Sequence, residues 1–508
     1  MFTTLRPSVF RRRAIAGASI GHSLRLLSTA PTASSPEWVN EFSKLGVLPD
    51  LVKGMNEQNW RQPTPVQKAV IPRLLGGENI VMAASTGSGK TLAFILPALQ
   101  KLSSQEQQGY TRLIRRPRCL VLVPTRELAR QVLGCVKSLS HFSKISSCAI
   151  LGGEQYGIQK KNLDRMVDLV VASPGRLVQH KEQGNLYLSQ VDTVIIDEVD
   201  TMLMQGFGPD IRAILRGVLQ RQRGVGGDNL ANSQPVQLVM ATATLTKAVR
   251  ALLADVKGDG GNGFIVNFTP EGDGAYVNKT LSTPLTHQVR VNLNIVEVDG
   301  LHRSLPNVRH VVDELKGTDK LVALQSIVQR QQSGSRTMLF CNSVASVRAV
   351  QYNLVESGTP ALSYHGDLNS REREANLEAF RNGTGRFLVC TDIAARGLDV
   401  PEIDHVVMVD FPLNPIDYLH RAGRCGRAGR KGLVTSIVAK RDKVLSDAIQ
   451  GAIARGFPLD NLSSSKRDYQ DNTGKLAQVI GRKPRGGNTS VRVGRGRNVG
   501  GKPKAPYL

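Results

Sequence analysis

Short runs of apolar, often β-branched residues recur along the chain and alternate with segments of about 10–15 residues that carry a helical pattern. Runs that are apolar almost throughout are typical of parallel strands buried on both faces. In the first half we expect strands at Asn79–Ala83, Cys119–Val123, Asp168–Ala172, Asp192–Asp197 and Val236–Ala241. In the second half we expect them at Arg336–Cys341, Ala361–Tyr364, Arg386–Cys390, His405–Val409 and Leu433–Val438. The alternation predicts a doubly wound α/β fold with a parallel sheet, used twice.

Composition divides the chain into five parts. Residues 36–270 and 306–460 are the two predicted α/β domains, and residues 271–305 are expected to be a linker with an irregular insertion. Gly, Asn, Asp and Thr are frequent around this segment, and a last strand of the first half is expected at Phe264–Asn267. The tail, residues 461–508, contains too few large apolar residues to fold alone.

Positive charge is concentrated at the two ends. The 508 residues include 66 Lys and Arg against 42 Asp and Glu, a formal net charge of +24. Residues 1–35 contain five arginines, many Ser and Ala and no acidic residue, a composition typical of a mitochondrial transit peptide. Arg25-Leu26-Leu27-Ser28 resembles a processing site. A plastid transit peptide and the basic tail of a nuclear or cytosolic protein are the alternatives.

The tail carries 11 basic residues against two acidic ones. Such a segment is expected to bind nucleic acid in a salt-sensitive and sequence-tolerant way, because it contacts phosphates rather than bases. An inert, solvated tail is the alternative. We therefore expect two folded domains flanked by disordered basic termini.

Several classes of protein are excluded by composition. With 41% hydrophobic and 21% charged residues, the chain as a whole is neither disordered nor collagen-like. No stretch approaches the roughly 18 consecutive apolar residues of a membrane-spanning helix, so no membrane partner is expected. The six cysteines include no CxxC pair, which argues against a zinc framework and, with their scarcity, fits a reducing compartment.

A glycine-rich segment follows the first predicted strand and precedes an apolar helix. Strand, loop and helix in this order are the context of a phosphate-binding loop, in which backbone N–H groups and the helix N-terminus face phosphate oxygens. Lys90 is expected to reach the β- and γ-phosphates, and the Thr91 hydroxyl to bind Mg²⁺. The expected loop comprises Ala84, Ser85, Thr86, Gly87, Ser88, Gly89, Lys90 and Thr91.

Two acidic residues end the predicted strand at residues 192–197. The carboxyl end of a buried parallel strand faces the same cleft as the phosphate loop. We expect Asp197 to hold Mg²⁺ and Glu198 to activate the attacking water. Alone, such a pair would fit a solvated loop equally well.

Six further short motifs accompany the phosphate loop and the acidic pair: Trp60-Arg61-Gln62-Pro63-Thr64-Pro65-Val66-Gln67, Pro124-Thr125-Arg126-Glu127-Leu128-Ala129, Gly152-Gly153, Ser173-Pro174-Gly175-Arg176, Thr242-Ala243-Thr244 and His420-Arg421-Ala422-Gly423-Arg424-Cys425-Gly426-Arg427. Together, these motifs resemble those of DEAD-box RNA helicases. The similarity covers about residues 42–440 and keeps the order of helicase superfamily 2. It implies two tandem RecA-like domains, with ATP and Mg²⁺ as cofactors and RNA as partner.

The resemblance assigns further roles. Gln67 would read the adenine edge and Trp60 would stack on the base, although Trp60 also fits as core filler. Asp399 would meet the ribose, and Arg424 and Arg427 would be arginine fingers. Thr242 and Thr244 would couple the ATP state to closure of the two domains. The implied RNA-backbone contacts are Thr125, Arg126, Gly153, Arg176, Gly366, Arg373 and Thr391.

Some positions depart from the family pattern. The acidic motif reads Asp197-Glu198-Val199-Asp200, with Val199 where the family has Ala, and both carboxylates are kept. Ser370 stands where the family usually has Gln, three residues before Arg373. The Ser370 side chain is too short to reach as far as Gln. An altered RNA grip or altered coupling in the second domain, compared with the family, is therefore a possible consequence of this residue.

We therefore expect an RNA-dependent ATPase that unwinds or remodels short duplexes in the mitochondrial matrix, as a monomer. Ribosomal or other structured RNA is the expected substrate, and the expected setting is ribosome assembly with assembly or ribosomal proteins as partners. An ATP-gated RNA clamp with little unwinding is one alternative. A DNA translocase of the same superfamily is a second, although the Gln67 motif argues against it.

Overall fold

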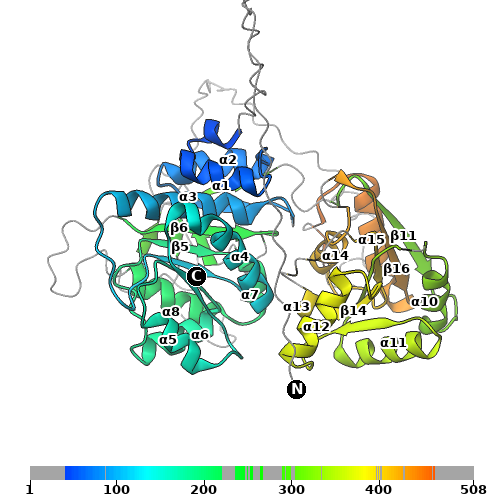
Figure 1. Cartoon of the computed structure of the whole chain (residues 1–508). Coiled ribbons are helices and arrows are strands. Elements are labelled where there is room, and N and C mark those ends of the chain that lie inside the picture. The colour runs from blue at the N-terminus through cyan, green and yellow to red at the C-terminus, as the bar shows by residue number, and fades with distance from the viewer. Residues whose placement is uncertain are drawn as a thin grey trace, which may run out of the picture. The chain divides into compact units, whose positions relative to one another are not determined.

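Two fully parallel sheets, each covered by helices on both faces, form most of the structure (Figure 1). The computed structural model describes residues 41–85, 87–219, 235–245, 249, 252–255, 264–266, 289–291, 293–298, 304–332, 334–395, 398, 400, 403–426, 429–459 and 462–463. The predicted fold class of two doubly wound parallel-sheet domains is confirmed. The predicted transit peptide and nearly all of the predicted basic tail lie outside the described residues.

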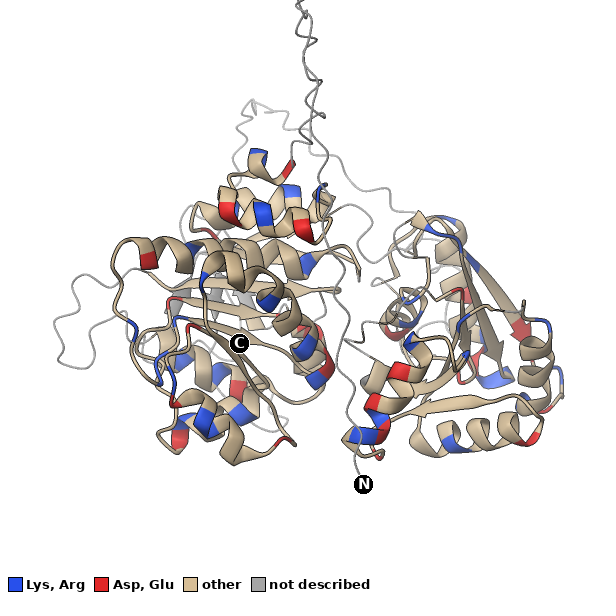
Figure 2. Ribbon diagram, in the orientation of Figure 1, with Lys and Arg blue, Asp and Glu red and all other residues tan. Residues whose placement is uncertain are grey.

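The first domain contains a seven-stranded sheet in the order β10-β1-β6-β5-β2-β4-β3. Every pairing between neighbours in this sheet is parallel, so all the strands end at the same edge. The strands are β1 (Asn79–Ala83), β2 (Cys119–Leu122), β3 (Ser147–Ile150), β4 (Leu169–Ala172), β5 (Thr193–Ile196), β6 (Gln237–Thr242) and β10 (Leu293–Glu297). Strands β1 to β6 carry no Lys, Arg, Asp or Glu, which lie on the surrounding helices and loops (Figure 2).

Alternate residues of β1 enter two separate hydrophobic cores. Ile80 and Met82 pack among helices α1 to α4, whereas Val81 and Ala83 pack among α6, α7 and α8 on the opposite face. Burial on both faces explains why the central strands are continuous apolar runs. The helical elements of this domain are η1 (Glu41–Leu45), α1 (Pro49–Glu57), α2 (Pro65–Leu75), α3 (Lys90–Gln107), α4 (Arg126–Ser143), α5 (Tyr156–Leu163), α6 (Pro174–Glu182), α7 (Val199–Met204) and α8 (Gly208–Leu219).

The second domain contains a six-stranded parallel sheet in the order β11-β16-β15-β12-β14-β13. Its strands are β11 (Val308–Glu314), β12 (Thr337–Cys341), β13 (Ala361–Tyr364), β14 (Phe387–Thr391), β15 (His405–Met408) and β16 (Gly432–Val438). Met338 and Phe340 face one core, and Leu339 and Cys341 face the other. Its helices are α10 (Lys320–Gln329), α11 (Val344–Glu356), α12 (Ser370–Arg381), α13 (Asp392–Ala395), α14 (Pro415–Ala422), η5 (Lys440–Asp442) and α15 (Lys443–Ala454).

The segment between the domains differs from the prediction in two respects. Leu293–Glu297, placed in the linker from sequence, is strand β10 and pairs with β1 in the first sheet. Phe264–Val266 is a strand, β8, but it is not the last strand of that sheet. It pairs antiparallel with β7 (Leu253–Asp255) and β9 (Val289–Val291) in a small sheet of its own.

All six cysteines are free, and all lie on or beside the core strands and helix α4. Burial raises the pKa of the Cys135, Cys148 and Cys341 thiols to about 12, and it also raises the pKa of Cys119 and Cys390 well above the ordinary value. These thiols are therefore protonated packing groups at neutral pH. Among the described residues, no helix combines the length and apolarity needed to cross a bilayer.

Candidate functional site

The predicted motifs lie in two adjacent groups along one edge of the first sheet. Neighbouring strands β1, β6 and β5 end at the glycine-rich loop, at Thr242 and at Asp197 respectively. Neighbouring strands β2, β4 and β3 end just before Thr125, Ser173 and Gly152. Because ligands of parallel α/β sheets bind beyond the carboxyl ends of the strands, the edge offers one site in two halves.

The glycine-rich loop turns from β1 into α3 through two residues with positive φ, Gly87 at 77° and Gly89 at 89°. Lys90, the first residue of α3, folds back and donates from Nζ to the carbonyl oxygens of Ala84 at 2.6 Å and Ser85 at 2.9 Å. Ser88 Oγ donates to the same Ser85 carbonyl at 2.8 Å. The loop therefore curls around the lysine ammonium, as a phosphate cradle requires. Thr86 lies outside the described residues, and Thr91 is half-buried in the first turn of α3.

Gln67 connects helix α2 to this loop. Its Oε1 accepts from the N–H of Thr64 at 2.9 Å and closes a capping box, while Nε2 donates to the Gly89 carbonyl at 3.0 Å. A Cβ added at Gly89, where φ is 89°, would be strained and would lie 2.5 Å from Gln67 Nε2, so it would displace the Gln67 amide. Gln67 therefore braces the loop. Its reading of adenine stays a prediction, and Trp60 is half-buried against the core, as the core-filler alternative expects.

The predicted acidic pair follows β5. Asp197 is 3% exposed, and its Oδ1 accepts from the N–H of Glu198 at 2.9 Å. Burial, and then the nearby Glu198 carboxylate, raise the pKa of Asp197 to about 7, against the opposing charge of Lys90. Glu198 has φ 50°, a strained value for a residue that is not glycine, and it is the N-cap residue directly before helix α7.

These groups fit a nucleoside triphosphate with Mg²⁺. Glu198 Oε2 is buried and has no hydrogen-bond donor within the described part of the chain. A buried acceptor without a donor costs free energy unless a ligand or water supplies one. Asp197 and Thr91 would hold the ion, and a divalent cation would also favour the ionised form of Asp197.

Thr242 and Thr244 form hydrogen bonds beside the acidic motif. Thr242 Oγ1 donates to the Thr244 carbonyl at 2.7 Å, and Thr244 Oγ1 donates to Asp200 Oδ2 at 2.6 Å. The Ala84 N–H donates to the carbonyl of Thr242 at 3.2 Å. The two predicted coupling residues therefore contact both the phosphate loop and the acidic motif.

Arg126 and Gly153, two predicted RNA contacts of the first domain, lie against each other. A Cβ added at Gly153, where φ is 72°, would lie 1.6 Å from Arg126 Nη2. Thr125 caps α4, its Oγ1 accepting from the Leu128 N–H at 3.2 Å. The Gly152 N–H donates to Ser173 Oγ at 3.1 Å and ties two of the motifs together.

Arg176 is held by residues that sequence reasoning did not single out. Its guanidinium lies over the ring of Tyr156, 5.5 Å from the ring centroid, and Tyr156 stacks on the buried ring of His180 at 4.2 Å. The Tyr156 hydroxyl accepts from Asn185 Nδ2 at 2.7 Å. Burial and the neighbouring Arg176 lower the pKa of His180, so the imidazole is neutral at physiological pH. Only spatial proximity reveals this arrangement, because Tyr156 and Arg176 lie on different helices.

In the second domain, the predicted residues follow neighbouring strands. Gly366 comes after β13, Thr391 ends β14, and Arg373 lies on α12, which begins at a capping box formed by Asn369 and Glu372. Arg424 is 4% exposed and donates from Nη1 to the Leu398 carbonyl at 3.1 Å. Asp399 and Arg427 lie outside the described residues.

Arg421 is a buried residue of the same motif with a role that the sequence did not suggest. Its guanidinium forms two hydrogen bonds to Asp392, both at 2.6 Å, and further ones to Asn342 Oδ1 and the Asp410 carbonyl. These partners follow three neighbouring strands, β14, β12 and β15. Arg421 therefore fixes the strand ends that present Thr391.

The fold and the loop define a tandem α/β protein with a phosphate-loop nucleotide site in its first domain. Two family models match the chain: DEAD/DEAH box helicase over residues 64–252, and helicase conserved C-terminal domain over residues 319–429. The chain is 31% identical over 468 residues to the ATP-dependent RNA helicase DBP2 of Chaetomium globosum, covering 92% of this chain and 73% of the relative. The chain therefore belongs to the family of DEAD-box ATP-dependent RNA helicases.

Other relatives are longer than the matched region. The chain is 37% identical over 435 residues to the DEAD-box ATP-dependent RNA helicase 39 of Arabidopsis thaliana, covering 85% of this chain but 64% of the relative. It is 34% identical over 420 residues to helicase 40 of Oryza sativa subsp. japonica, covering 82% of this chain and 46% of the relative. Among solved structures, S. cerevisiae Dbp5 bound to RNA and ADP BeF3 matches with a TM-score of 0.63 and 25% identity, covering 87% of this chain and all of that one.

Proposed function

We propose that this protein is an RNA-dependent ATPase that binds the backbone of RNA and locally unwinds or remodels short duplexes. The observation that carries the proposal is the meeting of Lys90, Asp197 and Thr242 at the ends of three neighbouring strands, β1, β5 and β6. RNA as the polymer is supported by family membership and by the adjoining half of the sheet edge. There, Thr125, Arg126 and Gly153 offer a hydroxyl, a guanidinium and a glycine without a side chain.

The residues of the nucleotide site have separate roles in hydrolysis. The nucleotide and Mg²⁺, when bound, supply a charge-neutralised phosphate chain open to attack by water. Lys90 and the loop N–H groups orient the phosphates. Glu198 takes the proton of the attacking water, and its buried Oε2 is the acceptor that lacks a donor among the described residues. Arg424 and Arg427 would stabilise the transition-state charge when the two domains close.

Coupling follows from shared contacts. Thr242 and Thr244 contact the phosphate loop and Asp200, so a change of nucleotide state reaches the strand ends that adjoin the RNA motifs. Any gain in RNA affinity caused by ATP must equal the gain in ATP affinity caused by RNA. Because the proposed contacts are to phosphate and sugar, sequence preference would arise elsewhere, and 2′-hydroxyl contacts would separate RNA from DNA.

The test is ATP turnover by the full chain, with and without single-stranded RNA and with DNA of the same sequence. We expect RNA, but not DNA, to raise turnover, and Glu198→Gln to abolish it while ATP binding persists. RNA-indifferent turnover would contradict the proposal. Stable ATP-dependent RNA complexes without strand separation would favour the RNA clamp instead.

We infer a mitochondrial matrix location from the composition of residues 1–35, five arginines without an acidic residue. Ribosome assembly, with ribosomal or other structured RNA and assembly proteins as partners, is the setting we propose there. Residues 1–35 fused to a fluorescent reporter should direct it to mitochondria, and replacing Arg6, Arg11, Arg12 and Arg13 with Gln should abolish import. Cytosolic or plastid fluorescence of the unchanged fusion would contradict the inference.

The basic segment at residues 461–508 is proposed to tether structured RNA, on the basis of 11 basic and two acidic residues. Deleting it should weaken RNA affinity and flatten its salt dependence. RNA-stimulated turnover at saturating RNA should persist, because the motifs of both domains remain. Unchanged affinity at low salt would contradict the tether.

A further inference from the structure

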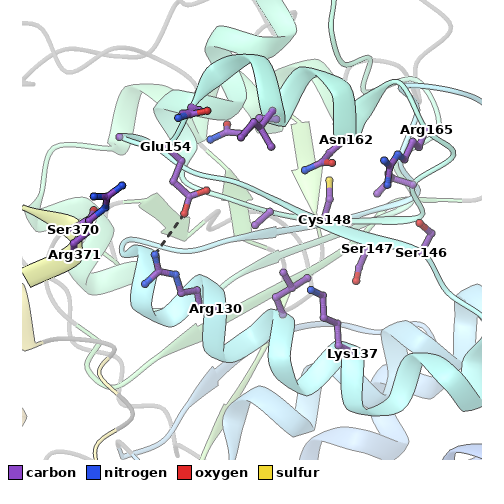
Figure 3. Close-up of a pocket in the computed structure, with 17 residues that line it drawn as sticks. Arg130, Lys137, Ser146, Ser147, Cys148, Glu154, Asn162, Arg165, Ser370 and Arg371 are labelled. Atoms are coloured by element: carbon purple, nitrogen blue, oxygen red, sulfur yellow. Dashed lines mark ion pairs between the residues drawn. The ribbon is translucent and has the colours of Figure 1, made fainter. Parts of the chain in front are cut away.

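A polar groove runs along the outer edge of the first domain's sheet, beside strand β3. Helix α4 forms one wall and helix α5, with the turn that follows it, forms the other (Figure 3). Ser147, Cys148 and Ala149 of β3 form the floor. Most of the residues that line this groove lie outside the motifs identified from sequence.

The floor presents backbone groups that no described strand pairs with, as well as side chains. β3 is the last strand of its sheet, with β4 as its partner on one side. The carbonyls of Ser146 and Ile150 accept from residues at the two ends of β4, so alternate residues of β3 face that strand. The backbone groups of Ser147 and Ala149 therefore point away from β4, along the open edge.

The walls carry an excess of positive charge. Arg130 and Lys137 lie seven residues apart on α4, two helical turns or roughly 10 Å along its axis. Both point into the groove from α4, and Arg165 faces it near Ser146 (Figure 3). Glu154 is the one carboxylate lining this part of the domain, and it lies 3.8 Å from Arg130 in a solvent-exposed pair. Three cations against one anion favour an anionic ligand.

One end of the groove meets the RNA half of the strand-end site. Gly153 lines the groove and also contacts Arg126, one of the proposed RNA contacts. A strand bound at Arg126 and Gly153 therefore has a continuous polar path past Arg130 to Lys137 and Arg165. Ser146, Ser147 and Asn162 lie beside the two distant cations and offer hydroxyl and amide groups, which are suitable partners for phosphate and 2′-hydroxyl groups.

We propose that this groove, resting on the RNA-binding function proposed above, binds the sugar-phosphate backbone of RNA that extends beyond the strand-end contacts. Lys137 and Arg165 are the residues that define the extension, because they are the cations farthest from Gly153 along the path. The groove would lengthen the bound RNA without selecting its sequence, since the contacts proposed for it are to phosphate and 2′-hydroxyl groups.

The experiment compares two RNAs and two double variants in the full-length protein. The first RNA is the shortest oligouridylate that fully stimulates ATP turnover, and the second is the same strand extended at its 5′ or its 3′ end. The groove variant is Lys137→Gln with Arg165→Gln. The matched control is Lys44→Gln with Lys53→Gln, which also removes two exposed positive charges from the first domain but on η1 and α1.

We expect extension at one end to tighten binding to the wild-type chain and to the control. The groove variant should lose that gain, and its slope of log affinity against log salt should fall by about 1.4 on extended RNA, because each neutralised phosphate of a single strand contributes about 0.7. Affinity for the short RNA and the turnover that it stimulates should be unchanged.

Other outcomes would overturn the proposal. Equal slopes for wild type and groove variant on extended RNA would show that Lys137 and Arg165 contact no phosphate. An equal loss in the control would show only a general charge effect. If the salt slope of the groove variant is unchanged and an acidic peptide that pairs with β3 displaces the extended RNA, the edge binds a protein strand instead. Failure of oligouridylates of every length to stimulate turnover by the wild-type chain would instead contradict the function proposed above.

Discussion

Thr244 donates its hydroxyl hydrogen to Asp200 Oδ2 at 2.6 Å, and both side chains are at most 2% exposed. Thr244 follows strand β6, and Asp200 lies in the first turn of α7, directly after the acidic pair. The bond therefore joins two motifs that are separate in sequence. The hydrogen bond also stabilises the buried Asp200 carboxylate, which is costly to leave without donors.

Replacing Thr244 with Val should break this link while keeping the shape of the side chain. We expect a loss of about 1–3 kcal/mol in the free energy of unfolding, because a buried acceptor loses a donor. RNA stimulation of ATP turnover should also fall, with little change in ATP affinity. Thr244→Ser, which keeps the hydroxyl, should preserve both. Equal behaviour of the Val and Ser variants in denaturant unfolding and turnover assays would count against the coupling role.

Gly153→Ala should weaken RNA binding by displacing Arg126. The new Cβ would lie 1.6 Å from Arg126 Nη2, at a residue whose φ is 72°. We expect the half-saturating RNA concentration to rise about tenfold, the equivalent of one charge-assisted hydrogen bond of about 1.5 kcal/mol. Gly152→Ala is the matched control, because its Cβ would meet nothing nearer than Ser173 Oγ at 3.8 Å. Similar RNA titrations for the two variants would contradict the prediction.

Tyr156→Leu should raise the half-saturating RNA concentration about threefold and leave the KM for ATP unchanged. The ring holds the Arg176 guanidinium at 5.5 Å, and exposed cation–π contacts contribute about 0.5–1 kcal/mol. Tyr156→Phe keeps the ring and loses only the bond from Asn185, so it should bind RNA more tightly than the Leu variant. If the two variants differ in thermal stability but not in RNA titration, Tyr156 is a packing residue alone.

Stability of the second domain should fall in mild acid because of His405. Gln331 Nε2 can only donate to Nδ1, so the neutral ring donates from Nε2 to Thr435 Oγ1 at 2.8 Å. Burial lowers the pKa of His405 to about 4, below the unfolded value of about 6.5. The unfolded chain therefore takes up the proton first, and the stabilisation present above pH 6.5 is lost as the pH falls.

The loss from His405 should reach about 2 kcal/mol at a pH of about 5. Urea unfolding at neutral and mildly acidic pH measures it. His405→Gln should show a smaller dependence on pH than the wild-type chain, whereas replacing the exposed His141 with Gln should not. Parallel curves for wild type and His405→Gln would refute this assignment.

The strands that were not predicted from the sequence, or were placed wrongly, lie mostly where the hydrophobic pattern is weakest. β10, β3 and β11 are three of the four edge strands of the two large sheets, and none was predicted. An edge strand is covered less completely, so β11 carries Arg309, His310 and Asp313 where a central strand would be apolar. Every central strand of both sheets was predicted, with bounds within two residues of those observed.

The site was predictable where chemistry depends on residues close together in sequence. The phosphate loop and the acidic pair each follow a single strand, so their placement came directly from the strand prediction. The supports of these residues come from other elements: Gln67 braces Gly89 from α2, and Tyr156 holds Arg176 from α5. Arg421 binds partners that follow three different strands. No local pattern reveals such contacts, because the topology of the sheet creates them.

The six native cysteines have a practical consequence for following the motion of this protein. Their thiols are buried or half-buried, and those with shifted pKa values stay protonated near neutrality, so a maleimide reacts with them slowly. A single cysteine introduced at an exposed site, such as Tyr352 in the second domain, would be labelled ahead of all of them. Fluorescent reporters can thus be attached to chosen positions in both domains of an otherwise unaltered chain, and the proposed approach of the two domains during ATP turnover can be timed directly.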